Sequence, residues 1–146
     1  MFNLCSAKVS QAGEEIVTIL VVEDHPGTRT AVMALLGKAF PGCQLLEADS
    51  AESALPLFEA KAPKLAIPKL VVMDIALPGM NGIQATQRIK ALCPETLVVM
   101  HSTSDLPIYR EESMAAGASA FVGKGRTSSE LVPVIAGLLP GVAKTA

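Results

Sequence analysis

A short apolar run that ends in one aspartate constrains this chain more than any other feature. Residues 70–74 read Leu-Val-Val-Met-Asp, and a turn rich in proline and glycine follows at 77–82. A continuous, partly β-branched apolar run is typical of a strand buried on both faces of a parallel sheet. A charge at the end of such a strand lies at the carboxyl edge of the sheet, where open α/β folds bind ligands. Asp74 alone could equally be a solvated residue that opens a turn, so the other strand ends decide.

Strand-like and helical segments alternate along the whole chain. Strictly alternating strands and helices predict a parallel sheet with helices on both faces and right-handed crossovers. The commonest order for five such strands is 2-1-3-4-5, so we expect an α/β, doubly wound, flavodoxin-like fold. The expected strands cover residues 16–22, 44–48, 70–74, 97–100 and 120–122, and the expected helices cover 28–40, about 50–60, 81–92, 106–116 and 130–139.

Local signals set several of the expected boundaries. Asn81 is placed to cap the helix that follows the central turn, and Gly117 is placed to end the next one. Ser128 or Ser129 is placed to cap the last helix. Pro56 falls inside the second helix, where it should cost about 3 kcal/mol or force a kink. The 44–48 strand is more polar than the others, which favours a position near a sheet edge.

Length and composition indicate one globular domain. Half of the 146 residues are hydrophobic and 18% are charged. The net charge of −2 does not indicate a nucleic-acid-binding protein, which would carry a positively charged surface. We expect a flexible leader at 1–15, a domain at 16–140 and a tail at 141–146. The three scattered cysteines, an odd number, favour reduced thiols and therefore a cytoplasmic protein. No apolar run is long enough for a bilayer, so we expect no membrane partner.

The predicted strand order brings several functional groups to one edge. Glu23 and Asp24 end the first strand, Asp74 the third, Ser102 follows the fourth and Lys124 the fifth. Clustered carboxylates need a cation, and oxygen ligands with room for water and phosphoryl oxygens suit Mg²⁺. Asp74 could then attack phosphorus and become an aspartyl phosphate, while Lys124 and the Ser102 hydroxyl hold the phosphoryl oxygens.

The two histidines offer no comparable arrangement. His25 precedes Pro26 and is interpreted as turn chemistry without a functional role. His101 is expected at the rim of the sheet edge rather than in catalysis.

On these residues the sequence resembles the receiver domain of bacterial two-component response regulators. The ordered matching pieces are residues 21–26, 73–82, 99–102 and 115–124, and the resemblance spans nearly the whole chain. It is most similar to receivers that are joined to helix-turn-helix output domains, and it implies a stand-alone receiver unless the chain is a fragment.

The resemblance implies a role for each residue of the acidic edge. Asp74 would be the phosphoacceptor, and Lys124 would pair with the phosphate. Asp24, Asp74 and the backbone carbonyl of Ala76 would bind Mg²⁺, with Glu23 assisting through water.

The resemblance also implies switch and modulator positions. Ser102 would be the switch hydroxyl, and Phe121 would be the aromatic residue that turns inward, although an ordinary core phenylalanine is an equal interpretation. Ala76, Thr103 and Ser104 stand where relatives tune access to the phosphoacceptor and the lifetime of its phosphate. Thr103 departs from the small residue that the family prefers, and Gly125 replaces a common proline.

The leading hypothesis is therefore a phosphorylation-controlled switch and not an enzyme with a separate substrate, with autophosphatase activity at most. A sensor histidine kinase or phosphotransfer protein would phosphorylate Asp74, and an unknown partner protein would read the surface around the fourth and fifth helices. Val132 and Leu139 would form a docking or homodimer patch, or simply pack in the core. The alternative function is a constitutive, phosphorylation-independent interaction module. An aspartate-based phosphohydrolase is disfavoured, because no second carboxylate stands two residues after Asp74.

Overall fold

Five parallel strands form one sheet in the order β2-β1-β3-β4-β5, as the sequence predicts. The computed structural model describes residues 16–59 and 67–141. The chain crosses from one half of the sheet to the other between β1 and β3, so the carboxyl ends of these two strands face one crevice. The strands are β1 (Thr18–Val22), β2 (Gln44–Ala48), β3 (Leu70–Asp74), β4 (Leu97–Ser102) and β5 (Ala120–Gly123).

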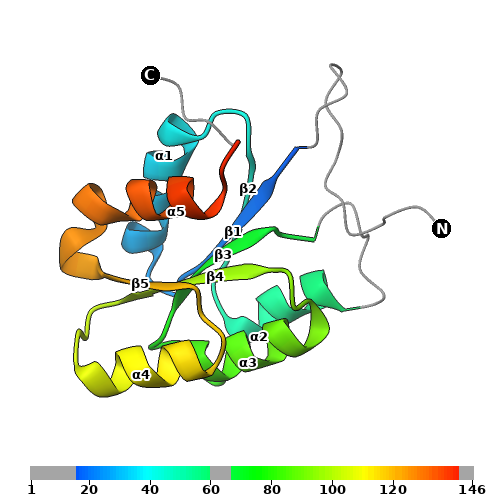
Figure 1. The fold of residues 1–146 in the computed structure, drawn as a ribbon, viewed down its shortest axis with the longest axis vertical. Helices are drawn as coiled ribbons and strands as arrows, with labels where there is room; N and C mark the ends of the chain where they lie inside the picture. The colour runs from blue at the N-terminus through cyan, green and yellow to red at the C-terminus, as the bar shows by residue number, and fades with distance from the viewer. Residues whose placement is uncertain (1–15, 60–66, 142–146) are drawn as a thin grey trace.

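Helices cover both faces of the sheet. Figure 1 shows α1 and α5 on one face, and α2, α3 and α4 on the other. No helix among residues 16–59 and 67–141 is long and apolar enough to span a membrane. The helices are α1 (Pro26–Ala39), α2 (Ala51–Ala54), α3 (Gly82–Leu92), α4 (Pro107–Ala115) and α5 (Val132–Leu138).

The sheet divides the hydrophobic core into two layers. Side chains alternate between the faces along each strand, so Val72 and Val99 pack with α1 and α5 while Met73 and Met100 pack with α2 and α3. The central strands β1 and β3 are buried along their whole length, whereas β2 is mostly half-buried at the sheet edge. This burial explains why β1 and β3 read as continuous apolar runs and why β2 is more polar.

Two helix starts are fixed by side-chain caps. The Nδ1 of His25 accepts a hydrogen bond from the backbone N–H of Thr28, and Pro26 occupies the first turn, so α1 begins two residues earlier than expected. Asn81 caps α3 as predicted, in a capping box with Gln84. Because α3 is held at its start, the turn between β3 and α3 has a defined path beside the strand end.

Other boundaries differ from the sequence predictions. The second helix has one α-helical turn and then a 3₁₀ turn at Leu55–Phe58, because Pro56 cannot continue the α-helical hydrogen bonds. The predicted cap at Ser128 or Ser129 is wrong, since helical turns already begin at Lys124 and run through 127–131 into α5. Gly117 ends α4 with a positive φ of 108°, as predicted.

The expected domain boundaries, at residues 16 and 140, fall at the limits of the described residues and stay predictions. The expected leader at 1–15 lies outside the described residues, as does the expected tail after Gly141. Leu139 is buried, and Val132 is half-buried against the α1–α5 core layer, which is the core-packing alternative for these two residues.

We predict that Gly82→Ala destabilises the protein by about 1–3 kcal/mol or more in the free energy of unfolding. A Cβ at residue 82 would overlap the backbone carbonyl of Asp74, so the start of α3 would move away from the end of β3. Chemical denaturation measures the change. Gly137→Ala in α5 is the matched control, because a Cβ there meets nothing within 4 Å and should stabilise the helix by about 0.5–1 kcal/mol. Equal stability of the two variants would contradict the prediction.

Candidate functional site

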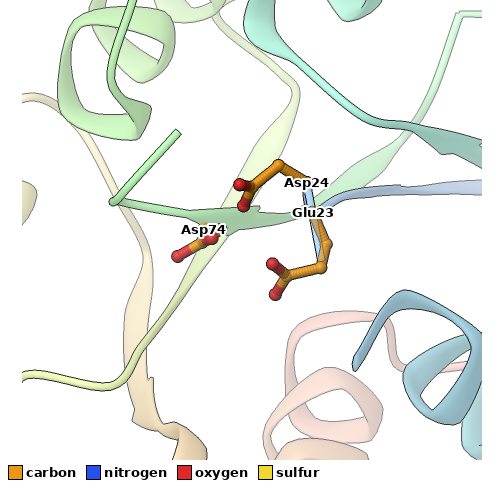
Figure 2. Close-up of side chains that lie close together, drawn as sticks. All are labelled: Glu23, Asp24 and Asp74. Atoms are coloured by element: carbon orange, nitrogen blue, oxygen red, sulfur yellow. The ribbon is translucent and has the colours of Figure 1, made fainter. Parts of the chain in front are cut away.

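Three carboxylates converge at the carboxyl edge of β1 and β3. Glu23 and Asp24 follow β1 directly, and Asp74 is the last residue of β3. One oxygen from each carboxylate lies within 4.8 Å of the others, and Figure 2 shows the three side chains around one space. Glu23 and Asp74 are buried, while Asp24 is exposed. The structure therefore brings together the acidic residues that the strand order predicts at this edge.

Lys124 supplies a positive charge in direct contact with this cluster. Its Nζ lies 2.7 Å from Oε1 of Glu23 and 3.4 Å from Oδ2 of Asp74. The contact to Glu23 is at the distance of a charge-assisted hydrogen bond, so charge and hydrogen bonding together hold Lys124 against this carboxylate. One ammonium faces two buried carboxylates, which leaves net negative charge at the site.

Backbone and helix contacts fix the two buried carboxylates. The backbone N–H of His25 donates to Oε2 of Glu23 at 3.2 Å, and the backbone N–H of Ala76 donates to Oδ1 of Asp74 at 3.2 Å. Arg29 in α1 donates from Nη1 to the carbonyl of Glu23 at 2.8 Å and pairs with Glu47 in β2 at 2.9 Å. Arg29 was not among the predicted site residues, because nothing in its local sequence distinguishes it from a solvated helical arginine.

Burial and charge move the pKa values of the pair in opposite directions. Burial raises the pKa of Asp74 to about 6; the Glu23 carboxylate adds to the rise, while Lys124 opposes it. Burial alone would also raise the pKa of Glu23, but Lys124 and the His25 backbone N–H together lower it below its ordinary value. Two neighbouring carboxylates resist joint ionisation, so a proton taken up by the pair resides on Asp74.

The donor set fits a hard divalent cation. Three carboxylates within 4.8 Å of one another supply only oxygen ligands. Mg²⁺ prefers such oxygens and keeps several water or phosphoryl ligands, which the exposed side of Asp24 leaves room for. Glu23, Asp24 and Asp74 are therefore the residues that could hold the ion. Ala76 lies exposed two residues after Asp74, and its carbonyl stays a predicted ligand.

The predicted switch and modulator residues lie on the neighbouring strands and loop. Ser102 is the buried last residue of β4, and its Oγ accepts a hydrogen bond from the backbone N–H of Ser104 at 3.1 Å. Thr103 is exposed at the same edge, and Ser104 is half-buried. Ser102 therefore lies at the end of the strand beside β3, with its hydroxyl bonded to its own loop.

Phe121 is half-buried in β5, between the core and α4. It packs against the core layer under α2, α3 and α4, and the guanidinium of Arg110 lies 4.6 Å from its ring centroid. Arg110 is itself held by Asp105 at 2.7 Å, and Asp105 also pairs with Arg126 at 3.0 Å. The ring thus has a cation–π partner on its outer side.

His101 is buried, so the prediction of a rim residue is wrong. Its side chain alternates with that of Ser102 along β4 and lies in the layer of α1 and α5. Burial lowers the pKa of His101 to about 4, with Lys124 adding to the fall and Glu23 opposing it. The imidazole is therefore neutral at pH 7. The sequence signal is position: His101 comes two residues after Val99, and alternate residues of a strand share a face.

The sequence is similar to known proteins over most of its length. The sequence model of the response regulator receiver domain matches residues 19–136. The chain is 32% identical over 124 residues to the transcriptional activator protein ExaE of Pseudomonas putida, covering 84% of this chain and 55% of that protein. It is 31% identical over 127 residues to the response regulator GacA of Pseudomonas aeruginosa, covering 86% and 56%. The chain thus spans about half the length of these curated relatives.

Solved structures are similar over most of the chain. A two-component response regulator of the LuxR family from Aurantimonas sp. SI85-9A1 is 31% identical, with a TM-score of 0.76 and 86% of each chain covered. The signal receiver domain of the putative response regulator NarL from Mycobacterium tuberculosis is 28% identical, with a TM-score of 0.75, and the match covers 86% of this chain and 98% of that one.

We predict that Asp74→Asn stabilises the protein at pH 8 in a chelating buffer, by up to about 3 kcal/mol in the free energy of unfolding. A folded pKa near 6 against an ordinary value of 3.8 means that ionised Asp74 destabilises the fold. The destabilisation is absent below pH 3.8 and complete above pH 6, so the gain from asparagine should shrink as the pH falls from 8 to 4.

Thermal melting of both proteins across this pH range measures the difference. His101 titrates in both proteins and cancels from the comparison. A lower melting temperature for Asp74→Asn than for the parent protein at pH 8 without metal would contradict the prediction.

Proposed function

Because the chain belongs to the response regulator receiver domain family, we propose that it is a phosphoacceptor switch that is phosphorylated on Asp74. A sensor histidine kinase or a phosphotransfer protein would donate the phosphoryl group in a Mg²⁺-dependent reaction. The observation that carries this proposal is the convergence of Glu23, Asp24 and Asp74 within 4.8 Å beside the Lys124 ammonium. A phosphoryl group with its negative oxygens needs such a balance of carboxylate nucleophile and cations.

The transfer requires little from the protein beyond position and charge. An oxygen of ionised Asp74 would attack phosphorus, the P–N bond to the donor histidine would break, and the released imidazole would keep or gain a proton from water. Oδ1 of Asp74 is held by the Ala76 N–H, which leaves Oδ2, the oxygen nearer Lys124, as the nucleophile. Mg²⁺ bound by Glu23, Asp24, Asp74 and the Ala76 carbonyl would neutralise charge on the phosphoryl oxygens.

We propose that the signal leaves through the surface formed by α4, β5 and α5. The Ser102 hydroxyl would exchange its bond to Ser104 for a phosphoryl oxygen, and Phe121 would turn inward from beneath Arg110. A partner protein, or a second copy of the chain, would read the change. Leu106, Ile108 and Met114 on and before α4 expose about half or more of their side chains and offer apolar contacts there.

A phosphoacceptor of this kind is not an enzyme with a separate substrate, and it would at most hydrolyse its own acyl phosphate. We propose a cytoplasmic location, which the three scattered cysteines favour, and no direct contacts to nucleic acid or membrane.

We predict one added phosphate, and only one, in the intact mass after incubation with a small acyl phosphate and Mg²⁺. The adduct should be absent in Asp74→Asn and when a chelator replaces Mg²⁺, because nucleophile and charge balance are then lost. Asp105→Asn is a matched control, since its carboxylate pairs with Arg110 and Arg126 outside the acidic cluster. If neither a small donor nor a cognate kinase gives an adduct, the protein is better explained as a constitutive interaction module. The exposed Thr103 beside the site would suit that function, because its side chain would restrict the access of donors to Asp74.

A further inference from the structure

A second chain of polar contacts runs behind the phosphorylation site, on the α1–α5 face of the sheet. His101 in β4 lies beside Asp74 of β3 and Val122 of β5 in the parallel register. Its side chain is buried, with 2% of its surface exposed. A buried polar side chain needs a hydrogen-bond partner, and His101 finds one across the sheet edge.

That partner is Thr127, three residues after Lys124. The Nε2 of His101 lies 2.7 Å from Oγ1 of Thr127, and the Thr127 hydroxyl donates to the backbone carbonyl of Lys124 at 3.0 Å. When the hydroxyl hydrogen lies on the Lys124 carbonyl, Oγ1 accepts a hydrogen bond from the His101 tautomer that is protonated on Nε2. The ring of His101 and the carbonyl of Lys124 are thus both within hydrogen-bond distance of the one hydroxyl of Thr127.

The segment after Lys124 is also held by the exposed ion pairs of Arg126 with Asp105 and Glu130, but these lie on its solvent side. Gly125 is exposed, and a Cβ at that residue would meet nothing within 4 Å. Lys124, Thr127 and the ring of His101 border an open pocket of about 680 Å³ against α1, so no helix packs tightly over the segment there. A lysine that must place its ammonium between two carboxylates needs a fixed backbone, and the bond from His101 through Thr127 provides one.

We infer that His101 is a positioning residue, which holds Lys124 at the phosphorylation site through its hydrogen bond with Thr127. The inference rests on the proposed function and extends it to residues outside the acidic cluster. Since Ser102 is the next residue of β4, the same bond joins the strand end that carries the switch hydroxyl to the helical turns leading into α5.

The test measures the phosphorylation rate of Asp74 from a small acyl phosphate at fixed donor and Mg²⁺ concentrations. Thr127→Val and His101→Leu should each lower the rate constant on the order of tenfold, because the ammonium loses its fixed position. Thr127→Ser, which keeps the hydroxyl, should retain a rate within about twofold of the parent protein. Ser129→Ala is the matched control, because its hydroxyl bonds the Arg126 carbonyl in the same manner but lies away from His101.

The double variant separates positioning from general damage. If both residues act through one bond, His101→Leu combined with Thr127→Val should be about as slow as either single variant, whereas independent defects would multiply to about a hundredfold. Multiplied defects, or a parent-like rate in folded Thr127→Val, would overturn the inference. Melting curves establish that each variant is folded. A parent protein that takes no phosphate would instead contradict the proposed function, so the two failures are distinct.

Discussion

The structure depends on the burial of two neighbouring carboxylates beside a single ammonium. Glu23 and Asp74 are nearly inaccessible to water at the ends of the two central strands, and Lys124 reaches both from the end of β5. Burying unbalanced charge is costly, and the raised pKa of Asp74 expresses that cost. In the proposed function this cost would be relieved, because a bound cation and then a phosphoryl group would supply the missing interactions. The charges of the site itself therefore determine how it responds to a bound cation or phosphoryl group.

Much of the fold could be predicted because its signals are local and agree with one another. The runs that became β1 and β3 are continuously apolar, the helices between strands have caps or breakers, and alternation then leaves few topologies. The errors fall where a local signal was ambiguous. His25 lies in a turn as predicted and also caps α1, a role that the sequence does not reveal, whereas the serines before α5 are predicted as caps although the preceding turns are already helical.

The candidate site was predicted as far as strand ends could determine it. Parallel strands in the order 2-1-3-4-5 place Glu23, Asp24 and Asp74 together, whatever the details of packing. The supporting contacts could not be predicted, because they depend on where long side chains reach across elements. Arg29 bridges α1, β1 and β2, and the bond between His101 and Thr127 joins residues 26 positions apart. The sequence spacing between Arg29 and its partners does not indicate contact, and neither does the spacing between His101 and Thr127.

The central claim is that the phosphoryl group is an acyl phosphate on Asp74, and chemical trapping tests it most directly. Borohydride reduces an acyl phosphate to the alcohol and converts a phosphorylated aspartate to homoserine, while free carboxylates are unaffected. After incubation with a phosphoryl donor and Mg²⁺, reduction and peptide sequencing by mass spectrometry should find homoserine at residue 74 in the phosphorylated fraction. Phosphate that survives reduction on a serine or histidine, or homoserine at Asp24 instead, would contradict the account.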